Sequence, residues 1–240
     1  MHGLCDPLGA VRVITNMLSF AQGLELTVDL SADFSLLAET RKAARGGLPS
    51  PMFDPSVSSL KPANAFWMAA RDKQGKPYSL QAFRLDMVYP NLAEWTLGWM
   101  TGLYVRRNEL ILPSLTSPPA HSRANALSGP LVYHGEMWID RTVKKRDWFD
   151  TFLKLGIILA YVKWQPEALW ALIGHTIATR GHVARSGYAV QERGFLQWQW
   201  RPEGADQSEW LVIAEREHLE LLIGDEAARA SNPKVDALLG

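Results

Sequence analysis

The sequence predicts an α/β fold in which helices flank a mixed β-sheet. Three consecutive segments indicate this: an apolar strand at 131–139, an amphipathic helix whose apolar stripe runs over 148–162, and a short apolar strand at 168–173. A strand, a crossing helix and a second strand form a βαβ unit, whose strands run parallel with a right-handed crossover. We place this unit, with a second helix over 176–185, at Leu131–Gly187.

The segments that come first in the chain alternate between helical and extended patterns. Apolar periodicity at 11–21 predicts a helix, and the alternating segment LELTVDL at 24–30 predicts a strand. Ser31 is a candidate N-cap for a helix over 32–44, which ends at a Gly-Gly pair.

A hairpin is expected next. AFWMAAR at 65–71 and YSLQAFRLDMV at 78–88 flank a turn that contains Gly75 and Pro77, which is typical of antiparallel strands. The preceding segment at 48–63 is rich in proline and serine and cannot sustain a helix. It is either a loop that lines a substrate site or a plain surface connector.

Residues 89–127 interrupt the pattern before the central strand, and we interpret them as an insertion. Within it, 92–104 has helical spacing, whereas 110–126 is loop-like and contains several prolines. An insertion of this length could form an acceptor lid or a contact in a homodimer.

The last part of the chain predicts a hairpin and a helix. Strands at 195–200 and 209–214 flank the turn RPEGADQS, and 216–229 has the spacing of an amphipathic helix. The 240 residues fit one large domain, and we treat 1–240 as a single domain.

Composition excludes several classes of protein. The formal net charge of zero argues against a protein whose whole surface binds nucleic acid, so a nucleic-acid partner is not expected. The single cysteine, Cys5, excludes an internal disulfide framework and, with the scattered histidines, gives no zinc-ligand pattern, so no metal site is expected. There is no signal-peptide pattern and no apolar run near the about 20 residues that span a bilayer, so we expect a cytoplasmic protein without a membrane span.

Tryptophan is abundant, with 10 residues. Aromatic side chains bury large areas, so most of these tryptophans are expected to pack the core and interfaces. A hydrophobic pocket for an acyl chain or an aromatic substrate is the functional alternative.

A strongly basic turn follows the central strand. It holds Arg141, Lys144, Lys145 and Arg146 directly before the helix. A helix N-terminus offers unpaired N–H groups and a partial positive charge, so this turn is a candidate phosphate site. The alternative is a solvated turn without a ligand.

This order of strand, basic turn, helix, strand and helix resembles the core of the GCN5-related N-acetyltransferase (GNAT) superfamily. In that family, a strand leads into a pattern Arg/Gln-x-x-Gly-x-Gly/Ala that cradles the pyrophosphate of acyl-CoA. Here the frame is Arg141-Thr-Val-Lys144-Lys145-Arg146, with basic residues at both glycine positions, and Gly187-Tyr188 is similar to the family's Gly-aromatic exit.

The resemblance implies a GNAT-like fold and acetyl-CoA or another acyl-CoA as co-substrate. It implies transfer of the acyl group to an amine acceptor that the sequence does not specify. The cofactor-binding residues that it implies are Trp138, Ile139, Arg141, Lys144, Lys145 and Arg146.

Proton transfer would then involve the central strand. Strand alternation places His134 and Glu136 side by side on one face, with Val132 and Trp138. Glu136 is the candidate general base, and His134 is an alternative because an unperturbed imidazole titrates near neutral pH. Either could instead be a hydrogen-bonded polar side chain without a catalytic part.

The family's general acid is a tyrosine four residues before the glycine, and this position is Val183 here. His182 is the neighbouring residue, but the helix points its side chain about 100° away from the direction of residue 183.

The function that the resemblance implies is an acyl-CoA-dependent N-acyltransferase. The alternative is a catalytically silent GNAT-like binding or regulatory module.

Overall fold

A computed structural model describes residues 6–140 and 147–231. Its strands form one eight-stranded sheet in the order β1-β2-β3-β5-β6-β8-β7-β4. The strands are β1 Thr27–Ser31, β2 Ala65–Arg71, β3 Pro77–Val88, β4 Leu112–Pro113, β5 Gly129–Ile139, β6 Ala168–Ile173, β7 Val190–Trp200 and β8 Ser208–Glu215.

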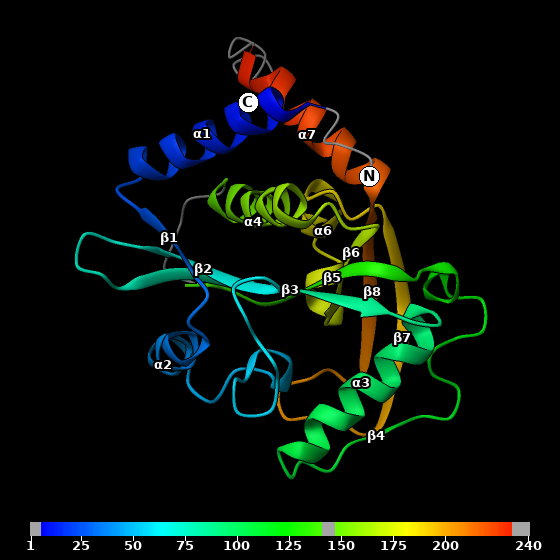
Figure 1. Ribbon diagram of the computed structural model, residues 1–240. Coiled ribbons are helices and arrows are strands. Elements are labelled where there is room, and N and C mark those ends of the chain that lie inside the picture. The colour runs from blue at the N-terminus through cyan, green and yellow to red at the C-terminus, as the bar shows by residue number, and fades with distance from the viewer. Residues whose placement is uncertain (1–5, 141–146, 232–240) are drawn as a thin grey trace.

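The helices cover both faces of this sheet (Figure 1). Figure 1 shows α1, α4 and α7 on one face and α2 and α3 on the other. The α-helices are α1 Pro7–Gly23, α2 Phe34–Arg45, α3 Leu92–Arg106, α4 Trp148–Trp164, α5 His175–Ala178, α6 His182–Arg185 and α7 Arg216–Ser231, and the 3-10 turns are η1 Pro51–Phe53 and η2 Arg123–Ala126.

The α/β fold with a mixed sheet is confirmed. Strands β5 and β6 run parallel and are joined by α4, which is the expected βαβ unit. The other neighbouring strands in the described residues run antiparallel, including the β2–β3 hairpin and the β7–β8 hairpin.

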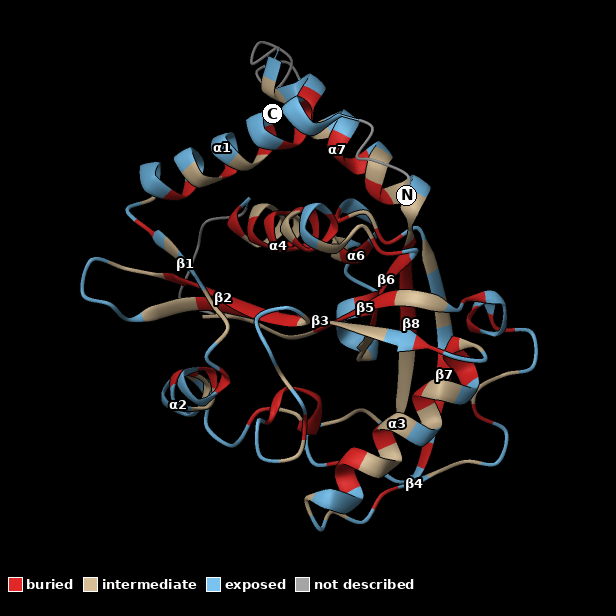
Figure 2. Ribbon diagram, viewed as in Figure 1, coloured by how far each residue is buried: buried red, intermediate tan, exposed pale blue. Residues whose placement is uncertain are grey.

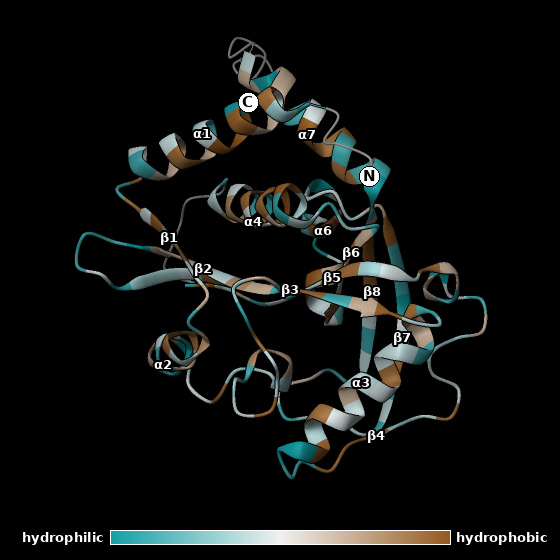
Figure 3. Ribbon diagram, in the orientation of Figure 1, coloured by the Kyte–Doolittle hydropathy of each residue, from teal (hydrophilic) through white to brown (hydrophobic). Residues whose placement is uncertain are grey.

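Two apolar cores lie on the two faces of the sheet. The upper core, between the sheet and the layer of α1, α4 and α7, includes Val13, Phe83, Phe152, Tyr161 and Leu219. The lower core, on the side of α2 and α3, includes Phe53, Trp67, Tyr133, Trp170 and Leu211. Figure 2 shows the buried residues of α1, α4 and α7 turned inward, and Figure 3 shows apolar residues on the same sides of these helices.

Helix starts follow local capping chemistry. The side chains of Asp6, Asp33 and Asn91 accept hydrogen bonds from the first turns of α1, α2 and α3. The N-cap of α2 is therefore Asp33, and the prediction of Ser31 was wrong. Ser31 ends β1, and its hydroxyl accepts a hydrogen bond from the N–H of Asp33.

The helix predicted over 176–185 is also different. The segment forms two short helices, α5 and α6, separated at Gly181, whose φ of 74° is left-handed. Glycine adopts this conformation without a steric penalty, so it breaks the helix here.

The Pro-rich segment at 48–63 packs under the sheet. Met52 and Phe53 in η1 are 4% and 0% exposed, and the ring of Phe53 stacks on Tyr133 of β5 at 5.7 Å between centroids. This segment therefore contributes side chains to the lower core and is more than a surface connector. Within 6–140 and 147–231, no helix is long and apolar enough to cross a membrane.

Candidate functional site

The parallel strands β5 and β6 separate partway along their length. Their pairing runs from Leu131 with Ala168 to Tyr133 with Trp170 and ends there. Beyond this point β5 stays paired with β3 as far as Ile139, and β6 stays paired with β8 as far as Ile173. The two strands therefore leave an opening inside the sheet, where the edge of β5 after Tyr133 has no strand partner among residues 6–140 and 147–231.

A β-bulge in β5 lies at this opening. Leu80 of β3 pairs with Trp138, and Ala82 pairs with Gly135, so β5 has one residue more than β3 between these pairs. Glu136 in the bulge has a left-handed φ of 54°. An extra residue reverses the alternation of side chains that follow it.

The bulge moves Glu136 to the lower face. Its Oε2 accepts a hydrogen bond from Nε of Arg41 in α2 at 2.7 Å, and its Oε1 accepts one from the N–H of Ser50 at 2.6 Å. The Glu136 side chain is only 4% exposed. Both carboxylate oxygens therefore hold α2 and the Pro-rich segment against β5.

His134 lies on the upper face. Its ring stacks on Phe83 at 4.4 Å between centroids, and its Nδ1 is 2.8 Å from the hydroxyl of Tyr188. The expectation that His134 and Glu136 lie side by side was therefore wrong, because the bulge places them on opposite faces.

Burial also determines the chemistry of His134. It lowers the pKa of the imidazole to about 3, so the ring is neutral at pH 7. Its Nε2 has no hydrogen-bond partner among the described residues. The near-neutral pKa expected from an exposed histidine does not apply at this position.

Gly135 precedes the bulge because the lower face leaves no room for a side chain. A Cβ at this position would lie 2.7 Å from the Phe53 ring. Beyond the bulge, Trp138 packs against the lower core and Ile139 against the upper core. These two residues lie where β5 has already left β6.

The basic turn precedes α4. Arg141, Lys144, Lys145 and Arg146 lie outside the described residues. The helix that follows, α4, begins at Trp148, and Asp147 at its N-cap makes no side-chain cap hydrogen bond.

Asp150 in the first turn of α4 contacts two side chains of α6. Asp150 accepts hydrogen bonds from Arg185 Nε at 2.7 Å and lies 2.9 Å from Nδ1 of His182. Burial raises the pKa of Asp150, but the contacts with Arg185 and His182 together outweigh it, so the net shift is downward. They hold α6 to the start of α4, which places a histidine and an arginine beside that helix end.

An aromatic cluster lies on the lower face beside the opening. Tyr133 is 4.7 Å from Trp170 and 5.4 Å from Trp99 between ring centroids, and Trp95 stacks on Trp99 at 4.7 Å. The guanidinium of Arg84 lies 4.9 Å from the Trp99 ring centroid. Tyr133 and Trp170 are also the last paired residues of β5 and β6, so the cluster lines the point where the strands separate.

Glu209 of β8 is a further candidate that the sequence analysis did not identify. It is half-buried, and its Oε2 accepts a hydrogen bond from Nε1 of Trp198 at 2.8 Å. Burial raises its pKa to about 7; the Trp198 hydrogen bond opposes this shift, and nearby Asp206 adds to it. Alternation along β8 could have identified it, because Glu209 shares a face with the apolar Leu211 and Ile213.

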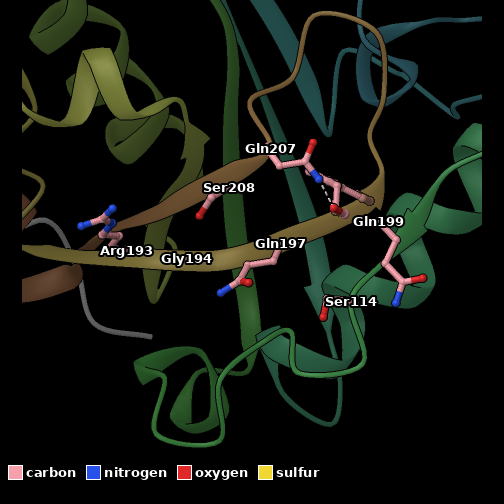
Figure 4. A pocket seen from close by; sticks show the side chains of 8 residues that line it. Ser114, Arg193, Gly194, Gln197, Gln199, Gln207 and Ser208 are labelled. Carbon is pink, nitrogen blue, oxygen red and sulfur yellow. Dashed lines mark hydrogen bonds between the residues drawn. The ribbon is translucent and has the colours of Figure 1, made fainter.

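A hollow of about 510 Å³ lies along the β7–β8 hairpin (Figure 4). Its lining is mostly polar and consists of Ser114, Arg193, Gly194, Gln197, Trp198, Gln199, Gln207 and Ser208. Gln197 and Ser208 alternate with Leu196 and Glu209, so the hollow lies mainly on the other face of the hairpin. We assign it no part in the site at the opening.

The described residues contain no group of histidine, cysteine and carboxylate side chains suited to a metal ion.

Comparison with known proteins gives structural likenesses only. No family model matches the chain, and no curated protein matches its sequence. Among solved structures, the chain is similar to Arabidopsis thaliana NAA60 in complex with acetyl-CoA, with 12% identity, a TM-score of 0.44, and coverage of 79% of this chain and 99% of that one.

Two further structures give similar values. An acetyltransferase of the GNAT family from Streptococcus pneumoniae is 10% identical, with a TM-score of 0.43 and coverage of 80% of this chain and 99% of that one. AAC(6')-Ib, solved in complex with Parmomycin and acetyl-CoA, is 10% identical, with a TM-score of 0.41 and coverage of 82% of this chain and 96% of that one. These TM-scores are below 0.5, so the likenesses assign no function to this chain.

Proposed function

We propose that the protein is an acyl-CoA-dependent N-acyltransferase that moves an acyl group, such as acetyl, to an amine. The observation that carries the proposal is the opening between β5 and β6, where no strand in the described part of the chain pairs with the edge of β5 after Tyr133. The start of α4 follows the end of this strand by a short segment.

The opening suits the extended arm of acyl-CoA. This arm carries amide groups, and an extended chain can bind an unpaired strand edge through main-chain hydrogen bonds. The bulge at Glu136 supports this proposal, since bulges end regular pairing and redirect the backbone near functional sites. Trp138 and Ile139 would then contact the arm.

The phosphates of the same cofactor suit the segment after β5. The N-terminus of α4 provides unpaired N–H groups and a partial positive charge. By sequence, Arg141, Lys144, Lys145 and Arg146 add full positive charges directly before it. We therefore propose that these residues bind the phosphates.

We assign different parts to the two side chains first considered as bases. Glu136 already accepts hydrogen bonds from Arg41 and Ser50, so we propose that it fixes the bulge and thereby the cofactor edge. His134 is neutral and buried against Phe83, and we propose that with Tyr188 it supports the strand from the upper side.

Isothermal titration calorimetry with acetyl-CoA and with a longer acyl-CoA tests the proposal. The variant Arg141→Ala/Arg146→Ala should bind about a hundredfold or more weakly, since each of the two lost charge-assisted contacts to phosphate costs about 1.5–3 kcal/mol. Arg12→Ala/Arg201→Ala removes the same charge at exposed positions and should bind as the wild type does.

The outcome also separates the two functions predicted from the sequence. Binding with transfer to an amine supports the enzyme, and binding without transfer across many amines supports a silent module. No binding of either acyl-CoA would refute the enzyme and leave the silent module as the function.

A further inference from the structure

We infer that Glu209 receives the amino group of the acceptor and removes its proton, and that this acceptor is a monocationic amine with an apolar body. The inference rests on the proposed acyl transfer and names the acceptor side of the same site.

Position is the first argument. Glu209 lies on β8, the strand paired with β6, and shares a face of β8 with Leu211, which belongs to the lower core. Burial raises the pKa of Tyr133, and among nearby charges the Glu209 carboxylate adds most to this shift. Strand β6 leaves β5 after Trp170 and stays paired with β8 as far as Ile173 with Trp210, so Glu209 lies one residue beyond this last pair, beside the part of β6 that has left β5.

Charge balance is the second argument. On the lower face, Arg41 pairs with Glu136, Arg84 with Asp86, and Arg107 with Asp54 and Glu109. Glu209, by contrast, forms no ion pair within the part of the chain that the structure describes, and its hydrogen bond there comes from Trp198. A half-buried carboxylate without a cation is costly, so a cationic ligand is the natural partner.

The surroundings make Glu209 a suitable proton acceptor. Nε1 of Trp198 from β7 donates a hydrogen bond to Glu209. The charge of Glu209 also acts electrostatically on Tyr104 of α3 and Tyr133 of β5, and the charge of Asp206 from the β7–β8 turn acts on Glu209. Burial, the largest effect, raises the pKa of Glu209 to about 7. A base is most effective when its pKa lies near the working pH.

Acyl transfer to the amine then releases one proton overall. The ammonium of the acceptor gives one proton to Glu209, and the neutral amine nitrogen attacks the thioester carbonyl carbon. A C–N bond forms, the C–S bond breaks, and the departing thiolate takes the second proton from nitrogen. Glu209 returns its proton to solvent, so the products are the amide, CoA thiol and one proton.

The aromatic cluster predicts that the part of the acceptor beyond its amino group is apolar. On the same face of the sheet as Glu209, Tyr133 contacts Trp99 and Trp170, and Trp95 and Trp99 are only partly buried. Aromatic faces favour apolar groups and attract cations. An arylalkylamine fits this combination, whereas a polyamine or an aminoglycoside would bring charges that the apolar wall does not match.

A binding measurement without cofactor tests the inference independently of the proposed function. Phenethylamine is titrated against the full-length protein by tryptophan fluorescence and calorimetry at pH 8, with phenethyl alcohol as its neutral analogue. Glu209→Gln should weaken amine binding by about tenfold or more and leave alcohol binding unchanged. Glu203→Gln removes an exposed carboxylate from the turn of the same hairpin and should change neither.

A kinetic measurement completes the test. With acetyl-CoA and phenethylamine, kcat/KM should rise with pH around a midpoint near the pKa of about 7, and Glu209→Gln should abolish this rise. Glu209→Asp, which keeps the charge, should retain the pH dependence at a lower rate.

The outcomes distinguish the two ideas. Equal binding of phenethylamine to wild type and Glu209→Gln, or no binding to either, would overturn the role of Glu209 even if acyl-CoA binds. Loss of amine binding in Glu209→Gln supports that role even if acyl-CoA does not bind, in which case acyl transfer is refuted and the amine site stands.

Discussion

Glutamine at position 209 should stabilise the protein at neutral and alkaline pH. Burial raises the pKa of Glu209 from its ordinary value of 4.5 to about 7, so the folded chain disfavours the charged form. Glu209→Gln removes that charge and keeps an oxygen that can accept the hydrogen bond from Trp198.

The pKa shift sets the size and the pH range of the effect. Below pH 4.5 the carboxyl is protonated in both the folded and the unfolded chain, so the variant gains nothing from the lost charge. Between pH 4.5 and 7 the wild type loses stability as the unfolded chain ionises first. Above pH 7 the full difference applies, and a shift of about 2.5 units at 1.36 kcal/mol each corresponds to about 3 kcal/mol.

Urea denaturation followed by tryptophan fluorescence measures this difference. Wild type, Glu209→Gln and the control Glu203→Gln are compared at about pH 4.5, 7 and 8.5, and only Glu209→Gln should become more stable relative to the wild type as the pH rises. A stability difference that is constant with pH, or that falls as pH rises, would refute the placement of Glu209 in a half-buried site without a cation.

Three further predictions concern β5. Burial lowers the pKa of the His134 imidazole to about 3, so its NMR signals should show no titration between about pH 5 and 8, and a midpoint near 6.5 would contradict its burial. The protein should lose stability as the pH falls below about 6.5, because the imidazole then gains a proton in the unfolded chain but not in the folded one. Glu136→Ala should cost about 3–5 kcal/mol in urea denaturation, because it leaves Arg41 without its buried partner, and a loss under 1 kcal/mol would contradict the anchor. Gly135→Ala should cost about 1–3 kcal/mol and lower the melting temperature, because the added methyl meets Phe53; an unchanged melting temperature would show that the ring moves away freely.

Much of the fold could be predicted because hydrophobic periodicity is strong in long elements. The βαβ unit and the two hairpins follow from apolar runs and from turns marked by glycine and proline. The helix over 176–185 could not be predicted as two helices, because the sequence does not say that Gly181 takes a left-handed φ.

The site was harder to predict than the fold. A bulge at Glu136 leaves no clear mark in sequence, yet it moves this side chain to the face opposite His134. Glu209 was overlooked for a different reason: its alternation with apolar residues is visible, but its lack of a cation depends on pairing between distant arginines and carboxylates.

The central claim is that acyl-CoA binds at the edge of β5 where this strand leaves β6. Hydrogen exchange measured by mass spectrometry, with and without acetyl-CoA, tests it most directly. Bound cofactor should slow exchange in peptides that cover 134–139 and the start of α4, and should leave exchange in β1 unchanged. Binding without protection at 134–139 would place the cofactor elsewhere and contradict the account.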